Sequence, residues 1–413
     1  MNLEFFIAKR LISGKDHKIS ISAPIIKIAI AAIALGLIMM LVALATGTGL
    51  QQKIREKVAA FNGHIQIYNY DNNLSDVSVV PISKKQEFFP EFKDVEGIAH
   101  VQAVATKGGI IRTTETFEGI IAKGVGPEYR WRGLEEYLVE GRMPDYSGSL
   151  NTEVMLSTTL GSRLGLELGD TFFAFFLKED DPSKNPNQRK FEVVGLYDSG
   201  FADIDGLYIF TDIRHIQRMN KWTEEQVGNF EIFLDDFAQV DEKNREIYGK
   251  TESDLDTQTL REKYYQIFEW IDLFDFNIAL IIGIMIIVGG INMITALLVL
   301  ILERTPMIGV LKALGASSWS IRKVFIYNAA YLIGIGLFWG NLLGIGIIWI
   351  QDTYRIFKFP NPQEYYMEYI PINIDVLHIL LLNLGVFLLC SSMLLIPSYI
   401  INRISPVKAI KFE

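Results

Sequence analysis

Four long apolar runs limit what this chain can fold into. They cover residues 25–45, 278–302, 324–350 and 376–401, and each can cross a hydrocarbon layer of about 30 Å as a helix of about 20 residues or more. The block at residues 49–275 is too long to be a loop and must be a folded domain. We therefore expect a membrane α-helical fold of four transmembrane helices, with a large α+β domain between the first and second.

The distribution of charge predicts a topology. The chain has a net charge of −9, but residues 50–275 alone hold 25 basic and 40 acidic side chains, a net of −15. Short cytoplasmic segments of membrane proteins are enriched in Lys and Arg. Both chain ends and the loop after the second run are therefore expected to be cytoplasmic, and the acidic domain and the 351–375 loop external. The basic residues behind this topology are Lys9, Arg10, Lys15, Lys18, Arg304, Lys312, Arg322, Lys323, Arg403, Lys408 and Lys411.

The same pattern divides the chain into nine segments. Residues 1–24 are expected to form an amphipathic helix at the cytoplasmic interface. The small residues at 43–45 resemble a signal cleavage site, but 24 residues precede a core of about 20, which favours an uncleaved span. The spans are placed at 25–48, 276–302, 324–350 and 376–401, the external domain at 49–275 and the external loop at 351–375. The cytoplasmic loop is placed at 303–323 and the tail at 402–413.

The cytoplasmic loop carries an amphipathic pattern of its own. Met307, Val310, Leu311 and Leu314 recur at intervals of three or four residues, which predicts one apolar stripe on a short helix that stops at Gly315. A helix outside the bilayer with an exposed apolar stripe needs a partner. This segment is therefore expected to bind another protein.

Motifs of enzyme chemistry are missing from the sequence. Gly249-Lys250-Thr251 matches the end of a phosphate-binding loop, but Asn244 stands where that motif needs its first glycine. Five His and one Cys form no cluster at metal-ligand spacing. We therefore expect no catalytic residue, no metal site, no cofactor bound by this chain and no nucleic-acid partner. Any nucleotide hydrolysis is expected in a separate protein.

The external domain has the pattern of a mixed α and β fold. β-rich runs predict strands at residues 64–70, 101–105, 119–123, 153–156, 171–176, 191–197, 207–210 and 230–234. Helices are predicted at 158–164, ended by Gly165, at 212–219 with Asp212 near the N-cap, and at 258–273, running into the second span. The sequence places no boundary between lobes of this domain.

The membrane runs hold no acidic or basic residue at mid-membrane, unlike the spans of most ion transporters. Gly336, Gly340 and Gly344 are spaced for close helix packing. Mostly apolar walls suit acyl chains better than ions. Four methionines are candidates for the lining of a lipid cavity, with helix packing as the simpler explanation: Met39, Met40, Met285 and Met293.

One string points to a family. Residues 304–316 read R-x-x-x-I-G-V-L-K-A-L-G-A and lie between the second and third spans. Together with one span, a large external domain and three further spans, this string resembles the FtsX/MacB-like permease superfamily, which includes lipoprotein-releasing transporters, macrolide-type efflux permeases and the cell-division ABC permease. The ending at 406–410, PVKAI, is similar to the family's ending. The resemblance covers the whole chain.

The resemblance implies partners and an energy source. A separate ABC ATPase dimer would bind ATP and Mg and receive the 303–316 helix in a groove. A second permease copy or a paralogue would enclose, with the first and second spans, an apolar cavity open to membrane lipid. Glu303 and Arg304 would be rim charges of the ATPase contact. The residues that would fill the groove are Met307, Ile308, Val310, Leu311 and Leu314.

Two features are similar to the lipoprotein-releasing (Lol) branch of the family. Tyr365, Tyr366 and the stretch 369–372 resemble the approach to the last span in those permeases. The loop at 176–191 lies where one Lol permease carries a hook that grips a periplasmic lipoprotein chaperone, although a polar hairpin loop explains it too. The candidate chaperone contacts are Leu177, Pro182, Pro186, Gln188 and Arg189.

The Lol branch implies a function. The chain would extract acylated lipoproteins from the outer leaflet of the inner membrane of a diderm bacterium and hand them to the periplasmic chaperone. Two alternatives stay open. One is an efflux permease of a MacB-like tripartite system, and the other is a mechanotransmission permease that moves no substrate and regulates a cell-wall enzyme.

Overall fold

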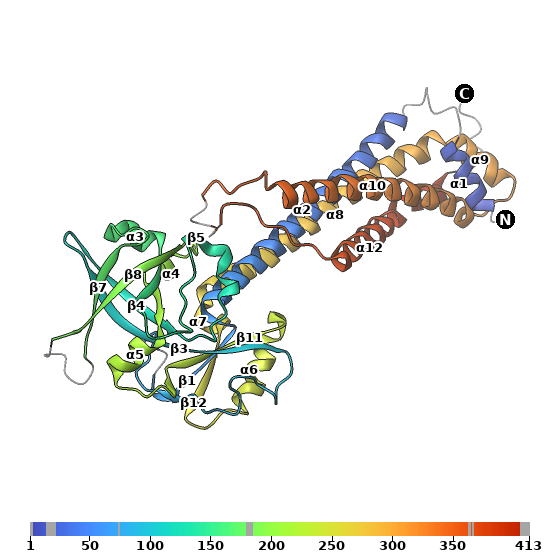
Figure 1. The fold of residues 1–413 in the computed structure, drawn as a ribbon. Helices are drawn as coiled ribbons and strands as arrows, with labels where there is room; N and C mark the ends of the chain where they lie inside the picture. Colours follow the sequence, from blue (N-terminus) through green and yellow to red (C-terminus); the bar gives the residue numbers. More distant parts are fainter. Residues whose placement is uncertain are drawn as a thin grey trace. The chain divides into compact units, whose positions relative to one another are not determined.

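The computed structural model describes residues 3–13, 22–72, 75–178, 185–361, 365 and 367–404. The chain divides into two compact units (Figure 1). The helical unit comprises residues 1–52, 270–358 and 369–413, and the sheet unit comprises residues 53–269 and 359–368. Within the described residues, four helices are long and apolar enough to cross a membrane, and an α+β domain lies between the first and second in the chain. The expected fold class is confirmed.

The long helices extend beyond the apolar runs. Helix α2 continues to Asn62 and α8 begins at Tyr265, so both carry polar turns into the sheet unit. The elements of the helical unit are α1 (Leu3–Ser13), α2 (Ser22–Asn62), α8 (Tyr265–Glu303), α9 (Thr305–Ala313), α10 (Ser318–Tyr354), α12 (Val376–Met393), α13 (Leu395–Ser398) and the 3-10 helix η6 (Tyr399–Arg403).

Small residues bring α10 against α2. A Cβ atom added at Gly336 would lie 2.8 Å from Ile33 Cγ2, and one at Gly340 would lie 2.9 Å from Leu37 Cβ. Gly344 faces Leu41 in the same way. The absence of a side chain lets the two helix backbones approach, which is how membrane helices gain packing energy. The packing predicted for this glycine series is confirmed.

One ten-stranded sheet dominates the sheet unit within the described residues. Its path runs β12-β1-β11-β3-β4-β9-β6-β8-β5, and β7 pairs with both β3 and β8. The strands are β1 (Ile65–Asn69), β2 (Ile82–Ser83), β3 (Ile98–Arg112), β4 (Phe117–Val125), β5 (Leu138–Gly141), β6 (Glu153–Ser157), β7 (Thr171–Phe176), β8 (Asn187–Tyr197), β9 (Tyr208–Asp212), β10 (Gln226–Val227), β11 (Asn229–Leu234) and β12 (Leu255–Thr259). Strands β2 and β10 form a separate pair.

Because β7 pairs with β3 and β8, part of the sheet closes on itself. The closed ladder runs β3-β4-β9-β6-β8-β7 and back to β3, which leaves these strands few free edges for unwanted pairing. Helices of the unit are α3 (Thr158–Leu164), α4 (Ala202–Asp205), α5 (Ile213–Asn220), α6 (Val240–Tyr248) and α7 (Leu260–Lys263). The 3-10 turns are η2 (Tyr70–Asn72), η3 (Trp131–Gly133), η4 (Glu135–Tyr137) and η5 (Phe237–Gln239).

The strands expected from β-rich runs are all present, with one much longer than predicted. Strand β3 continues through Gly108 and Gly109, where a Cβ at Gly109 would lie 2.6 Å from the Phe176 ring. Glycine there lets β7 approach, so a residue that weakens an isolated strand serves this one. Helix α3 is found as predicted, with Gly165 at φ 65°, and Asp212 caps α5.

The helix predicted at 258–273 is wrong at its start. Residues 255–259 form β12, which pairs with β1 along its whole length. Thr259 then caps α7 in a capping box with Glu262, and α8 begins only at Tyr265. Pairing with a strand about 190 residues earlier, Tyr68 opposite Asp256, outweighs the local pattern. Strands β2, β5, β10 and β12 and helix α6 were not predicted.

Candidate functional site

Helix α9 forms where the amphipathic pattern predicts a short helix. Pro306 lies in its first turn, where a missing N–H costs no hydrogen bond. After the helix, Gly315 adopts φ 92°, and the N–H of Ala316 donates to the carbonyl of Leu311 at 2.9 Å. This closure needs a left-handed residue, which glycine supplies without strain.

The structure divides the predicted stripe of α9 between two faces. Ile308 is fully buried, and Met307 and Leu311 pack against the same core of the helical unit. Val310 and Leu314 instead expose 49% and 80% of their surface. The inner residues therefore hold α9 to its own chain, and only the outer ones remain for a partner.

Exposed residues at four-residue spacing run from the end of α8 along α9, namely Leu302 in the last turn of α8, Pro306 and Val310 in α9, and Leu314 at its C-cap. We call these four residues the outer face of α9. Glu303 beside them is exposed and Arg304 is half-buried. The sequence pattern missed Leu302 and Pro306 because the first closes the second apolar run and the second is a helix breaker.

Basic residues of the same segment turn inward. The ammonium of Lys312 donates to the carbonyl oxygens of Ile401 at 2.7 Å and Ile404 at 2.8 Å. The guanidinium carbon of Arg322 lies 4.5 Å from the centre of the Tyr399 ring. Both residues, expected only as cytoplasmic charges, therefore contact the end of the fourth span.

Helix α1 packs on the start of α10. The hydroxyl of Ser320 donates to Glu4 Oε1 at 2.7 Å, and this bond lowers the pKa of the Glu4 carboxyl. The rings of Phe5 and Tyr327 meet edge to face at 6.3 Å. The amphipathic start of the chain is thus tied to the residues that follow α9.

The four methionines proposed for a lipid cavity lie in different surroundings. Met40 and Met293 are buried in the core of the helical unit, and Met285 packs partly against it. Met39 exposes 46% of its surface. The structure therefore leaves Met39 as the methionine of this set with the most surface available to a ligand or a partner.

The loop proposed as a chaperone hook connects two paired strands. Phe176, which ends β7, lies opposite Asn187, which begins β8. Leu177 exposes 61% of its surface, Pro186 and Gln188 are exposed, and Arg189 is half-buried with a pKa lowered by that burial. Pro182 lies outside the described residues.

An exposed apolar patch lies on β7, the strand that leads into this loop, and on the neighbouring strands β3 and β4. Phe117, Arg112 and Phe173 are directly opposite one another across β4, β3 and β7, so their side chains share one face. Ile110, two residues from Arg112, lies on the same face. Ile110, Phe117 and Phe173 expose 44%, 71% and 44% of their surface, and we call these three the β3–β4–β7 patch. Sequence reasoning missed it because the three strands meet only in the folded domain.

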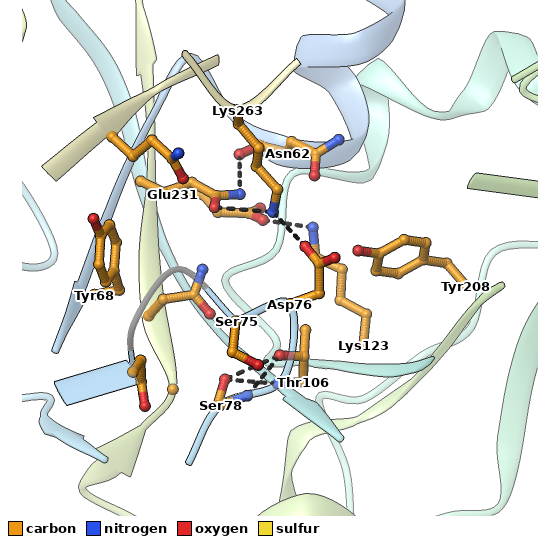
Figure 2. A pocket seen from close by; sticks show the side chains of 15 residues that line it. Asn62, Tyr68, Ser75, Asp76, Ser78, Thr106, Lys123, Tyr208, Glu231 and Lys263 are labelled. Atoms are coloured by element: carbon orange, nitrogen blue, oxygen red, sulfur yellow. Dashed lines mark hydrogen bonds and ion pairs between the residues drawn. The ribbon is translucent and has the colours of Figure 1, made fainter. Parts of the chain in front are cut away.

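Helix α2 ends in the sheet unit at a buried ion pair. Lys123 Nζ on β4 lies 2.6 Å from Glu231 Oε1 on β11 and 2.5 Å from the carbonyl oxygen of Phe61 in the last turn of α2. Gln102 donates to the other oxygen of Glu231 at 2.8 Å. Burial lowers the pKa of Lys123, and the charge of Glu231 opposes that shift. Figure 2 shows Lys123 directed toward Glu231 beside Asn62.

The ion pair borders a small polar cavity of about 40 Å³. Lys263 reaches Asp76 across it at 3.2 Å (Figure 2). The hydroxyl of Tyr264 donates to Asn62 Oδ1 at 3.0 Å, which joins the end of α2 to the residue before α8. A space of this size suits ordered water rather than an organic ligand. We interpret the cluster as an anchor for the two helices, which the sequence hid because Lys123 and Glu231 are 108 residues apart.

Comparison with known proteins assigns the family. The profile of the MacB-like periplasmic core domain matches residues 28–263, which is more than half of the chain. The profile of the FtsX-like permease C-terminal region matches residues 279–406. The chain belongs to the FtsX/MacB-like permease family. The resemblance that the 304–316 string indicated is thereby confirmed.

Some relatives of this permease are named for lipoprotein release and others for macrolide export. The lipoprotein-releasing system transmembrane protein LolC of Neisseria meningitidis is 22% identical over 437 residues, with 100% of each chain covered. LolC of Haemophilus influenzae is 23% identical over 370 residues, covering 86% of the permease and 89% of the relative. A macrolide export ATP-binding/permease protein, MacB of Campylobacter jejuni, is 22% identical over 354 residues, covering 78% and 50%.

A solved extracellular domain of the ABC-type transporter YknZ from Gram-positive bacteria is also similar, with a TM-score of 0.31 and 14% identity over 47% of the permease. The sequence relatives and the four apolar helices together describe an integral membrane protein and an ABC-type permease. Membership of such a family implies an ATPase partner.

Proposed function

We propose that this permease works with an ATPase to extract lipoproteins from the outer leaflet of the inner membrane and hand them to a periplasmic chaperone. The observation that carries the proposal is the match to LolC over 100% of both chains. The match to MacB covers 50% of that relative. ATP and Mg would be bound by the partner ATPase, and this chain would supply the path for the substrate.

The outer face of α9 is the proposed seat of the ATPase. Val310 and Leu314 would enter its groove, with Glu303 as a rim charge that fixes orientation. Met307, Ile308 and Leu311 would act indirectly, because they pack into the chain's own core and hold α9 in place. This division supports a helix that transmits a push to the bundle as well as binding a partner.

The proposed topology follows the charge pattern. Both chain ends and α9 would lie in the cytoplasm of a diderm bacterium, and the α+β domain in the periplasm. The chaperone would dock at the β7–β8 loop and the β3–β4–β7 patch, because Leu177 and Phe117 there are exposed at 61% and 71%. Arg112, opposite both Phe117 and Phe173, would give this surface a positive charge.

Exposed apolar stripes on α2 and α8 support a path for acyl chains. Leu35 and Met39 on α2 expose 61% and 46% of their surface, and Ile284 and Ile287 on α8 expose 48% and 55%. In a membrane these stripes face either lipid or a second permease. We propose that a second copy or a paralogue closes them into a cavity that admits the acylated end of the lipoprotein.

The proposed ATPase seat is tested by Leu314→Asp. Leu314 is 80% exposed, so the charge should leave folding intact. Loss of one interface anchor should weaken binding of the ATPase about tenfold or more, measured by titration of the ATPase against the permease in nanodiscs. Val139→Asp, at a residue 62% exposed in the sheet unit, is the matched control. Unchanged binding in the Leu314 variant would remove α9 as the seat.

The substrate is tested by purification of the full chain in mild detergent. Co-purified ATPase together with triacylated lipoproteins supports the proposal. Recovery of the ATPase with hydrolysis stimulated by small amphipathic molecules, and without lipoprotein, would favour efflux instead. That second candidate rests on the match to the MacB-like core domain at residues 28–263.

A further inference from the structure

The ammonium of Lys312 on α9 is held by backbone carbonyl oxygens from the end of the fourth span. Its ammonium donates to the carbonyl oxygens of Ile401 at 2.7 Å and Ile404 at 2.8 Å, and lies 3.5 Å from that of Asn402. These carbonyls belong to the last turn of the fourth span and the residue after it. Carbonyls at a helix end have no partner within the helix, and a lysine ammonium satisfies several at once.

The fourth span is irregular where Lys312 holds it. Helix α12 ends at Met393, the short helix α13 contains Pro397, and η6 completes the span as a 3-10 helix. Such a broken end lacks the stiffness of a continuous α-helix. Its position therefore depends on side-chain contacts from neighbouring elements.

Apolar residues of the same two elements lie in one buried cluster. Ile401 and Ile308 are both fully buried in the core of the helical unit. Arg322, at the start of α10, stacks on Tyr399 of η6. One face of α9 is thus fixed to the end of the fourth span, while its outer face is exposed. A helix that is fixed on one face and exposed on the other can transmit a displacement from a partner to the element to which it is fixed.

We propose that Lys312 is a positioning residue that makes α9 and the cytoplasmic end of the fourth span move as one body. A displacement of α9 by the ATPase would then reach η6 and α12 directly through Lys312. This inference rests on the proposed function, because it assigns a route to the push that the ATPase delivers. It also gives the fourth span an active part, in addition to the first and second spans that would line the cavity.

The atoms that accept hydrogen bonds from the Lys312 ammonium are backbone carbonyl oxygens. No side-chain change at 401–404 removes them, so the variants must be made at the donor. Lys312→Met keeps the length and apolar stem of the side chain and removes the donor. Lys312→Arg keeps a charged donor. Lys323→Met removes a charge from the same segment, at a residue whose ammonium lies 5.9 Å from the Trp319 ring.

The activity test compares these variants in the full transporter with its ATPase in proteoliposomes. Lys312→Met should keep ATPase binding and basal hydrolysis, while lipoprotein released per ATP falls about tenfold, the scale of one lost charge-assisted hydrogen bond. Lys312→Arg should restore most of the coupling, and Lys323→Met should behave like the wild type. Wild-type coupling in Lys312→Met would overturn the inference.

A distance measurement tests the same contact without the ATPase. Spin labels at Ala313→Cys and Ile396→Cys, both exposed positions, report the separation of α9 and α13 in the permease alone. The native thiol of Cys390 is buried. The distance distribution should be narrow in the wild type and broad in Lys312→Met. Equally narrow distributions would overturn the inference.

The two measurements separate this inference from the proposed function. If no lipoprotein is released by the wild-type transporter, the proposed function fails. The distance distribution of the permease alone then still decides whether Lys312 joins α9 to the fourth span. If the wild type releases lipoprotein and Lys312→Met does so at the same yield per ATP, the proposed function stands and only the inference fails.

Discussion

Helix α2 is held in two different ways along its length. In the helical unit, Gly340 of α10 lets the helices touch, with apolar atoms on both sides. In the sheet unit, the last turn of α2 is held by Lys123, a buried charge paired with Glu231. Apolar contact is sensitive to shape and insensitive to pH, whereas the buried pair depends on charge and on both partners being present.

The largest expected loss of stability follows removal of Lys123 from its buried ion pair with Glu231. Lys123→Met leaves Glu231 buried without its charged partner and the Phe61 carbonyl without its donor. Breaking a buried pair costs about 3–5 kcal/mol, and hydrogen–deuterium exchange of β4 and β11 in the full chain should show that loss. The double variant Lys123→Met with Glu231→Leu should recover most of it, because no charge is then buried alone. An equal loss of stability in both variants would mean that the Lys123–Glu231 pair contributes through its packing and not through its charges.

A smaller loss of stability is expected from a substitution at the contact between Gly340 of α10 and Leu37 of α2. Gly340→Leu forces a side chain against Leu37, where even a Cβ would lie 2.9 Å from the Leu37 Cβ. Overpacking of this kind costs about 1–3 kcal/mol, seen as a lower melting temperature in detergent. Gly346→Leu is the control, since a Cβ there meets no atom within 4 Å. If both variants melt alike, α2 and α10 do not pack through this glycine.

An effect of similar size to that of the glycine contact is a pH dependence confined to the sheet unit. His64 Nδ1 accepts from the N–H of Leu234 at 2.8 Å, and burial lowers the pKa of His64 to about 4. The folded pKa lies below the unfolded one, so the stabilisation is complete above pH 6.5 and is lost as the pH falls toward 4. By pH 5 the loss should be about 2 kcal/mol.

The pH effect is isolated by comparing wild type with His64→Gln, whose amide oxygen can still accept from Leu234. The comparison is needed because burial raises the pKa of Asp205 to about 6. Asp205 therefore stabilises the folded state as the pH falls, whereas His64 destabilises it. Exchange of β1 and β11 should depend less on pH in the variant. Identical pH profiles would show that His64 does not titrate in this range.

The same contrast explains what the sequence could predict. The bundle and α9 follow from local patterns, namely apolar length, glycine spacing and a three-to-four periodicity. Lys123 and Glu231 are 108 residues apart, and Lys312 and Ile401 are 89 apart, so no local pattern connects them. The sequence also did not show that the apolar stripe of α9 is partly buried and partly exposed. Periodicity predicts one apolar face of a helix, but it does not show which residues of that face pack against the chain's own core. Strand β12 was missed for the same reason, since its partner β1 lies far away in the sequence.

We propose that this permease releases lipoproteins with energy delivered through α9. The most direct measurement is release of a triacylated lipoprotein from proteoliposomes that contain the permease and its ATPase, with a soluble chaperone outside. We expect release that requires ATP and the chaperone and that is lost in Leu314→Asp. Release of no lipoprotein by the wild type, with hydrolysis of ATP stimulated instead by a small molecule, would contradict it.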